Sequence, residues 1–371
     1  MYCLSIFQNT LVFSMINMLR AGFHKHKLIF KQPAGTSRGV LYGRDSLFLL
    51  LSDTLIPGVV GIGECGIIPG LSFDDRPDFE DAVRFLCDGI NKGKVPDQQW
   101  FANWPSLMFA YETALRDLTT GGERILFDSE FTAGQKGMPI NGLVWMGDKD
   151  FMLRQVDEKI ASGFEVIKLK VGAIDFNQEL EILSVIRSAF DAGKITVRLD
   201  ANGAFEVAEA PGKLEKLAKF GIHSIEQPVK HGNIAAMADI CRHSPIPVAL
   251  DEELIGISDS GEGKRLLDKI LPQYIILKPS LLGGFEKSQQ WIADAEERNA
   301  GWWVTSALES NIGLNAIAQW TATLGNPMPQ GLGTGGLYIN NITSPLEVVK
   351  GHLHYNPQLP WDFSIAGVTG I

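Results

Sequence analysis

The clearest indication of the fold lies in residues 166–171, which read Val-Ile-Lys-Leu-Lys-Val. Successive side chains of a β-strand point to opposite faces, so Lys168 and Lys170 share one face while Ile167, Leu169 and Val171 share the other. Helical apolar spacing precedes this stretch over residues 151–161 and follows it over residues 178–189. A strand between two helices predicts βα units and a parallel sheet.

Short apolar runs of this kind recur about every 25 to 30 residues. They lie at 140–145, 166–171, 196–201, 222–225, 247–250, 274–277 and 302–305, and an eighth is expected near 331–335. Most gaps hold a helical pattern, such as 286–298. This repeat predicts an α/β fold, a (β/α)8 TIM-type barrel whose last unit is short or irregular. The alternative is a doubly wound sheet, which is less favoured because no G-x-G-x-x-G motif follows a strand.

The region before the repeat has a different texture. Strand-like runs at 23–30, 47–51 and 59–62 precede a helical stretch at 78–120, and glycines punctuate a long loop expected between the first two runs. We therefore predict an α+β capping domain over 18–135, a barrel over 136–335 and a C-terminal segment, 336–371, that returns to the cap. Residues 1–17 are apolar and nearly uncharged. They are expected to be an upstream or dispensable extension, with a membrane anchor as the alternative.

Composition limits the classes of protein and partner. The 371 residues are 45% hydrophobic and 20% charged, which excludes a wholly disordered chain. The net charge of −10 removes any global attraction for nucleic acid or anionic membrane. The four cysteines are far apart and form no C-x-x-C pair, which indicates a reduced, cytoplasmic protein. A homo-oligomer is compatible with the sequence.

Polar side chains interrupt the predicted strands in a regular way. The strands of a buried parallel sheet are expected to be apolar on both faces, yet five successive strands carry charged residues at or near their carboxyl ends. These residues are Lys168, Lys170, Arg198, Asp200, Glu226, Asp251 and Lys278. One such residue would be an ordinary boundary residue or helix cap, but five strands in succession indicate the mouth of a barrel, where active sites form.

Three of these residues suit a metal ion. Asp200, Glu226 and Asp251 come from adjacent strands, and no histidine or cysteine accompanies them. Oxygen-only ligands favour a hard cation, so we predict a Mg²⁺ site in which Mn²⁺ can substitute. Lys168 and Lys170 approach from one side and Lys278 from the other. Burial beside other cations lowers the pKa of a lysine, which allows it to remove a proton next to a carboxylate.

The ordered motifs resemble the enolase superfamily, in its muconate-lactonizing subgroup. The motifs that carry the resemblance are Gly61-Ile62-Gly63-Glu64, Lys168-Leu169-Lys170, Asp200-Ala201-Asn202, Glu226-Gln227-Pro228, Asp251-Glu252, and Lys278-Pro279 with Gly283-Gly284. Within the subgroup, residues 31–39 and 305–310 are similar to the o-succinylbenzoate synthase family. Dipeptide epimerases of the subgroup usually carry an Asp-x-Asp at the later position, and it is absent here.

The resemblance implies a lyase of menaquinone biosynthesis and a role for each residue. Asp200, Glu226 and Asp251 would bind Mg²⁺. Lys170 would take the α-proton of a cyclohexadiene carboxylate and return it to the departing hydroxyl, Lys278 would stabilise the enediolate, and Lys168 would polarise the substrate carboxylate. Substrate contacts are expected from Arg198, Asn202, Thr305 and Ser306, and from Gly35 and Thr36 in a closing cap loop.

Two other functions stay open at this point. The first is an N-acylamino acid racemase or dipeptide epimerase, in which the same two lysines act on opposite faces of one carbon. The second is a non-catalytic binding protein that kept the barrel, although a binding module needs no base opposite an acid. Glu309 has no assigned role, and a residue at the start of a helix is the plain interpretation. Trp302 and Trp303 are expected to pack between barrel and helices.

Overall fold

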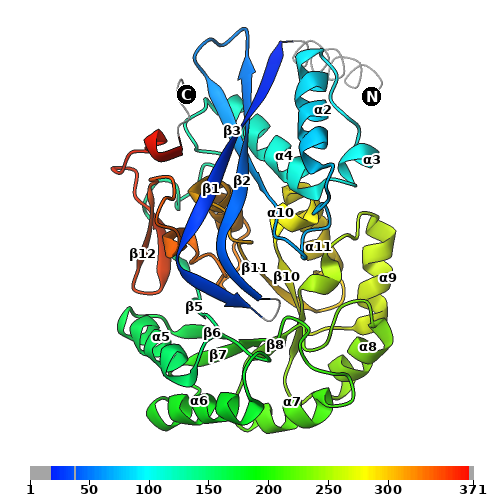
Figure 1. The fold of residues 1–371 in the computed structure, drawn as a ribbon, viewed down its shortest axis with the longest axis vertical. Helices are drawn as coiled ribbons and strands as arrows, with labels where there is room; N and C mark the ends of the chain where they lie inside the picture. Colours follow the sequence, from blue (N-terminus) through cyan, green and yellow to red (C-terminus); the bar gives the residue numbers. More distant parts are fainter. Residues whose placement is uncertain (1–17, 37–38, 367–371) are drawn as a thin grey trace.

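The computed structural model describes residues 18–36 and 39–366. The predicted extension, residues 1–17, lies outside the described residues. Figure 1 shows a cap domain above a ring of parallel strands and helices. Among the described residues, no helix combines the length and apolar character needed to cross a bilayer.

The cap begins with an antiparallel sheet of three strands, β1 (Leu19–Thr36), β2 (Gly39–Asp53) and β3 (Val60–Gly66), in that order. Its helices are α2 (Phe79–Asn91), α3 (Gln98–Phe101) and α4 (Pro105–Thr119). Helix α4 packs directly on β3, because a Cβ at Gly61 or Gly63 would lie within 2.0 Å of a carbonyl oxygen of α4. The strands and helices together bury the apolar core of the cap.

The first two strands correct one prediction. A long loop was expected between them, but β1 and β2 pair from Leu19↔Asp53 to Thr36↔Gly39, leaving only residues 37–38 between the strands. The register shifts between Ile29 and Ala34, so a bulge bends the ladder there. The result is a long hairpin that runs from the cap toward the barrel (Figure 1). The backbone hydrogen bonds between β1 and β2 fix the direction of the hairpin, whereas a loop without such bonds would have no fixed direction.

The barrel has the predicted βα order. Seven parallel strands form one sheet in the order β11-β10-β9-β8-β7-β6-β5. They are β5 (Gly142–Val144), β6 (Val166–Lys170), β7 (Thr196–Asp200), β8 (Ser224–Glu226), β9 (Val248–Leu250), β10 (Tyr274–Leu277) and β11 (Gly301–Val304). The helices between and after them are α5 (Lys149–Ala161), α6 (Phe176–Ala189), α7 (Ala210–Ala218), α8 (Ile234–His243), α9 (Ser260–Ile270), α10 (Pro279–Leu282), α11 (Phe285–Glu296) and α12 (Asn311–Thr323).

The eighth position is filled by two residues instead of a full strand. Gln330 forms a parallel bridge with Ile140, and Gly331 forms one with Thr305, so the segment touches both edges of the sheet. A Cβ at Gly331 would lie 2.3 Å from Thr305 Oγ1, which explains why a glycine stands there. The expected irregular last unit therefore closes the barrel.

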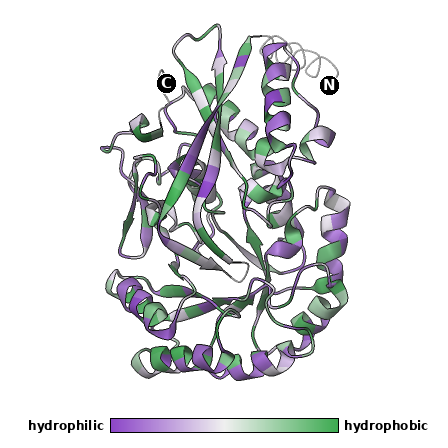
Figure 2. Ribbon diagram, in the orientation of Figure 1, coloured by the Kyte–Doolittle hydropathy of each residue, from purple (hydrophilic) through white to green (hydrophobic). Residues whose placement is uncertain are grey.

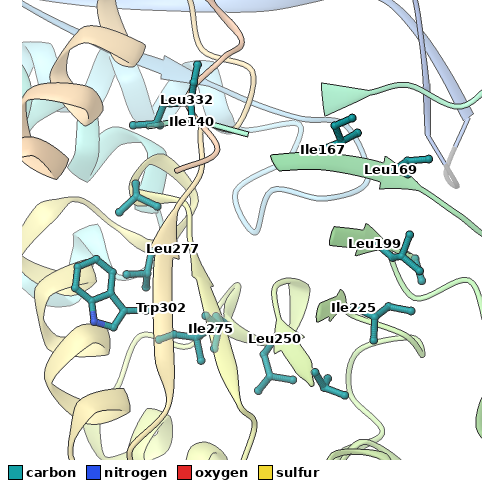
Figure 3. Packing of buried hydrophobic residues seen from close by; sticks show 14 of the residues in the cluster. Ile140, Ile167, Leu169, Leu199, Ile225, Leu250, Ile275, Leu277, Trp302 and Leu332 are labelled. Carbon is teal, nitrogen blue, oxygen red and sulfur yellow. The ribbon is translucent and has the colours of Figure 1, made fainter. Parts of the chain in front are cut away.

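The apolar side chains of the strands face the helices. Ile167 and Leu169 of β6, Leu199 of β7 and Ile225 of β8 lie in one core cluster (Figure 3). The helices that cover them carry both hydrophilic and hydrophobic residues, as Figure 2 shows for α6 and α7. This packing leaves the other strand face for the barrel interior, where the polar residues lie.

The C-terminal segment contacts the cap again. Strand β12 (Leu346–Val349) pairs with β13 (His352–Tyr355), which also pairs with β4 (Met138–Pro139), so the three form one small antiparallel sheet. Ile342 and Ala366 then pack with Phe48 and Ile62 of the cap sheet in one apolar cluster. Short 3-10 helices lie at Glu252–Leu254, Gly335–Leu337 and Ser364–Ala366.

Candidate active site and metal centre

A cavity of about 260 Å³ opens at the carboxyl ends of the barrel strands. Its floor holds Lys168, Lys170, Asn202 and Lys278, and its roof is the β1–β2 hairpin, through Gly39–Leu41, together with Ile68 and Leu71 of the cap. Parallel strands all end at this edge, so residues distant in the sequence meet here. The cavity has room for a small molecule only.

Three buried carboxylates lie beneath the cavity on successive strands. Asp200 ends β7, Glu226 ends β8 and Asp251 follows β9, and one oxygen from each lies within 4.8 Å of the others. All three side chains are at most 2% exposed. Among the described residues, this is the one group of three acids placed to share an ion. The structure thus brings the predicted metal ligands together.

Each predicted catalytic lysine touches this triad. Lys168 Nζ lies 2.5 Å from Glu226 Oε2 and 2.9 Å from Asp200 Oδ2, and Lys170 Nζ lies 2.6 Å from the same Asp200 oxygen. These two lysines belong to β6. Lys278 follows β10 on the opposite wall. The two lysine groups therefore flank the triad, as the strand count predicted.

The electrostatics of the three lysines differ. Burial lowers the pKa of Lys170, and the positive charges of Lys168 and Lys278 act in the same direction against the pull of Asp200. Burial also opposes the charge of Lys168 and of Lys278, but neighbouring carboxylates raise the pKa of both above the ordinary value. The expected depression of lysine pKa therefore holds for Lys170 alone.

The triad fits a divalent cation. Burial raises the pKa of Glu226 and of Asp251, and repulsion from neighbouring carboxylates adds to it. Glu226 Oε1 is buried without a hydrogen-bond partner among the described residues. A hard cation would satisfy that oxygen and offset the repulsion among the three carboxylates, and the ligand set contains only oxygen.

A fourth carboxylate, that of Glu252, extends the site beyond the predicted residues. Lys170 Nζ donates to Asn202 Oδ1 at 2.6 Å, and Asn202 Nδ2 donates to Glu252 Oε1 at 2.9 Å. Asn202 has a φ of 44°, a left-handed conformation that asparagine tolerates better than most residues. Asn202 thus lines the cavity as predicted and also orients the amine of Lys170. The role of Glu252 was missed because it appeared only as a neighbour of Asp251.

Arg198 is where the prediction fails. It was expected to contact substrate, but it is 1% exposed and does not line the cavity. Its Nη1 donates to the carbonyl of Pro329 at 2.8 Å and to Asn141 Oδ1 at 3.4 Å, and its guanidinium lies 4.0 Å from the ring centre of Trp303. It shares the inward face of β7 with Asp200 but stands two residues earlier, one layer deeper in the barrel. Because Trp303 contacts this inward-facing guanidinium, it packs inside the barrel and not, as was expected, between the barrel and its helices.

The remaining predicted substrate contacts divide into two groups. Thr305 and Ser306 do line the cavity, and Thr305 Oγ1 is buried without a partner among the described residues. Gly35 does not line it, because it lies within β1, where a Cβ would meet the carbonyl oxygen of Met146 at 2.7 Å. Thr36 ends the same strand, and its side chain lies outside the described part of the chain. Among the described residues of the hairpin, Gly39–Leu41 at the start of β2 line the cavity.

Several lining residues were missed by the sequence argument. Asn141, Leu143 and Trp145 line the first-strand side. The turn at Gly331–Gly335, in contrast, was expected to hold part of the substrate, and its Thr334 lines the cavity with Oγ1 2.6 Å from Ser306 Oγ. Neutral residues on short strands resemble ordinary core residues, so nothing in their type marked them. The one available signal was that residues 140–145 form the first strand of the predicted barrel. Alternate residues of that strand should face the barrel interior, as they do on the other strands.

Comparison with known proteins agrees with this geometry. A family model described as "Enolase C-terminal domain-like" matches residues 152–360. The chain therefore belongs to the enolase superfamily.

Within this superfamily, the o-succinylbenzoate synthase of Desulfotalea psychrophila is 44% identical over 369 residues, which cover 90% of this chain and 98% of the relative. The crystal structure of MenC from the same organism has a TM-score of 0.80 and 41% identity over 91% of this chain and 99% of that one. A more distant relative is the N-succinylamino acid racemase of Amycolatopsis sp, 24% identical over 86% of this chain and 88% of the relative.

Proposed function

We propose that this enzyme is a hydro-lyase that converts 2-succinyl-6-hydroxy-2,4-cyclohexadiene-1-carboxylate to 2-succinylbenzoate. One geometric observation carries the proposal: Lys170 and Lys278 stand on opposite walls of one small cavity, on either side of a carboxylate triad. The 44% identity to an o-succinylbenzoate synthase over most of both chains supports this substrate.

The reaction needs a base, a cation and a place for the substrate carboxylate. Lys170, as the neutral amine, takes the proton on the carbon next to the carboxylate, and the C–H electrons move into an enediolate. The same proton then passes from Lys170 to the hydroxyl group, which leaves as water on the same face and completes the aromatic ring. Because Asn202 Oδ1 and Asp200 Oδ2 both accept from Lys170 Nζ, the amine is held toward the cavity.

The other charged groups stabilise the negative charge that develops. Lys278 stays a cation beside Asp251 and faces the enediolate from the opposite wall, and Lys168 adds positive charge next to Lys170. Asp200, Glu226 and Asp251 would hold Mg²⁺, or Mn²⁺ in its place, which when bound supplies a positive charge for the substrate carboxylate. The cap hairpin covers the cavity and limits the access of water.

The test is a dehydration assay followed by the ultraviolet absorbance of the aromatic product. The wild-type enzyme should turn over the cyclohexadiene carboxylate, and Lys170→Ala should lower turnover about 10³-fold, since a positioned general base contributes on the order of 10² to 10⁴. Lys136→Ala, at a lysine whose side chain is 74% exposed, is the matched control and should retain activity. Full turnover by Lys170→Ala would show that the lysine assignment is wrong.

The second candidate is racemisation of N-succinyl amino acids, favoured by the lysines on opposite walls and by the Amycolatopsis relative. Solvent deuterium incorporation into these amino acids measures it directly. Deuterium exchange without any dehydration of the cyclohexadiene substrate would replace the hydro-lyase function with this one.

A further inference from the structure

Glu309 is a buried carboxylate between β11 and α12, and the proposed reaction gives it no task. Its side chain is 1% exposed. It does not cap α12, because Ser310 Oγ accepts the N–H of Ile312, and the carboxylate of Glu64 in the cap accepts the N–H groups of Ser310 and Gly313. The interpretation of Glu309 as a helix-start residue is therefore wrong.

The two oxygens of Glu309 join two parts of the active site. Oε2 accepts the N–H of Ala307 at 2.7 Å, and Oε1 accepts the hydroxyl of Ser280. Ala307 lines the cavity. Ser280 lies in the single turn of α10, directly after Lys278, whose carbonyl accepts the N–H of Leu281 at 2.8 Å. One carboxylate thus ties the cavity wall to the segment that carries Lys278.

The cap contacts the same residue, Ala307, through its carbonyl group. Arg44 of β2 is 4% exposed, and its Nη1 donates to the carbonyl of Ala307 at 2.5 Å. Gly66 gives this side chain its room, because a Cβ there would lie 1.9 Å from Arg44 Nη2. Ala307 is therefore held through its N–H by the barrel and through its carbonyl by the cap.

We propose that Glu309 is a positioning residue, which fixes the wall formed by Ala307 and Leu308 and, through Ser280, the backbone that carries Lys278. Arg44 makes this arrangement depend on the docked cap. The proposal rests on the proposed function, because its effects are measured as turnover. It concerns residues outside the metal ligands and the lysines themselves.

The physical basis is the strength of buried hydrogen bonds to a charged group. Burial raises the pKa of Glu309, and the nearby Arg44 guanidinium counters this. Removing the carboxylate leaves the N–H of Ala307 and the hydroxyl of Ser280 buried without their acceptor, so the two loops are free to shift. A shift of this kind changes the distance from Lys278 to the substrate, and the rate is sensitive to that distance.

The experiment uses three variants in the full chain, with kcat and KM measured per folded enzyme. Glu309→Gln should lower kcat/KM on the order of 10- to 100-fold, the factor that a hydrogen bond to a charged group contributes. Ser280→Ala removes only the hydrogen bond between Glu309 and the segment that carries Lys278. It should lower kcat and change KM by no more than about twofold. Arg44→Met removes the cap's hydrogen bond to Ala307, so its main effect should be a higher KM, with a smaller loss of kcat than in Ser280→Ala.

Coupling between the variants separates positioning from general stability. Because Ser280 acts through Glu309, the double variant Ser280→Ala/Glu309→Gln should have no lower a kcat than Glu309→Gln alone. The matched control is Glu64→Gln, which removes another buried carboxylate of the same interface that contacts neither Ala307 nor Ser280. It should lower Tm and leave kcat and KM unchanged.

Three results would overturn the proposal: additive kcat losses in the double variant, equal behaviour of Glu309→Gln and Glu64→Gln, or unchanged kcat and KM in both Ser280→Ala and Arg44→Met. If Glu309→Gln fails to fold, the single variants at Ser280 and Arg44 still decide the question. Absence of dehydration by the wild-type enzyme would instead refute the proposed function, which keeps the two failures distinct.

Discussion

Lys278 Nζ lies 2.5 Å from Oδ2 of Asp251, although the two residues are 27 positions apart in the chain. The contact joins the wall opposite Lys170 to the metal triad, so the ammonium of Lys278 and a divalent cation compete for the same carboxylate. Lys278 is therefore expected to have two distinct effects, one on turnover and one on metal binding, which can be measured separately.

Replacing Lys278 with methionine should have opposite effects on turnover and on metal binding. Turnover should fall at least about 10²-fold, because the cation that faces the enediolate is lost. Mg²⁺ should bind as tightly or more tightly, because Asp251 no longer pairs with an ammonium group. Steady-state kinetics and titration calorimetry measure the two effects. A weakened Mg²⁺ affinity would contradict the competition inferred from this contact.

Removal of the metal should abolish dehydration, and added Mg²⁺ should restore it. Glu226→Gln should weaken Mg²⁺ binding strongly, because a neutral amide replaces one of three charged ligands. Asp294→Asn changes a carboxylate of α11 that is also buried, at 2% exposed, but lies outside the triad, and it should leave Mg²⁺ affinity unchanged. Activity that survives thorough chelation would refute the metal site.

Asn141 should be sensitive to charge. Its Oδ1 accepts from Arg198, and the residue lines the cavity in which an anionic substrate would bind. Asn141→Asp keeps the shape but adds a negative charge, so KM should rise at least about tenfold, while Asn141→Ala should raise it less. The comparison of KM between the two variants checks this. Equal KM values in both variants and the wild type would place the substrate away from β5.

Stability should fall between about pH 4.5 and pH 7 because of Glu179. Burial raises the pKa of this carboxyl from 4.5 to about 7 in the folded chain, while it accepts the N–H of Gly172 after β6. The unfolded chain loses this proton first, so stability decreases as pH rises through this window and stays lower above it, by up to about 3 kcal/mol.

Glu179→Gln should remove this pH dependence. Its free energy of unfolding should match that of the wild type near pH 4 and exceed it at pH 8, as measured by urea denaturation. Glu181→Gln is the control on the same helix, with a side chain 60% exposed, and should follow the wild-type profile. A wild-type profile that is flat over this range would refute the shift.

Residue type and spacing were sufficient for the barrel and its charged residues. Alternation within residues 166–171 placed Lys168 and Lys170 on one face, and the βα repeat brought them to the same edge as Asp200, Glu226 and Asp251. Burying charge costs so much free energy that its regular recurrence at strand ends carries information. A neutral residue such as Leu143 or Trp145 carries no such signal, because an apolar residue on a strand looks like an ordinary core residue.

Two features were decided only by the tertiary structure: how deep in the barrel each inward-facing side chain lies, and which residues of the cap contact the barrel. Arg198 and Asp200 share a face of β7, but they stand in different layers, and a period of two does not say which layer lines the cavity. The hairpin of β1 and β2 stands where a loop was expected. A strand is stabilised by hydrogen bonds to a neighbouring strand, and the local sequence does not show which segment that neighbour is. Likewise, the two donors to Glu309 and its cationic neighbour come from segments up to 265 residues away, since Arg44 belongs to the cap.

By itself the sequence determined the chemistry at the barrel mouth, because alternation and repeat length are local properties. Which neutral residues enclose the cavity, and how the cap fixes its wall, depends on packing between distant segments.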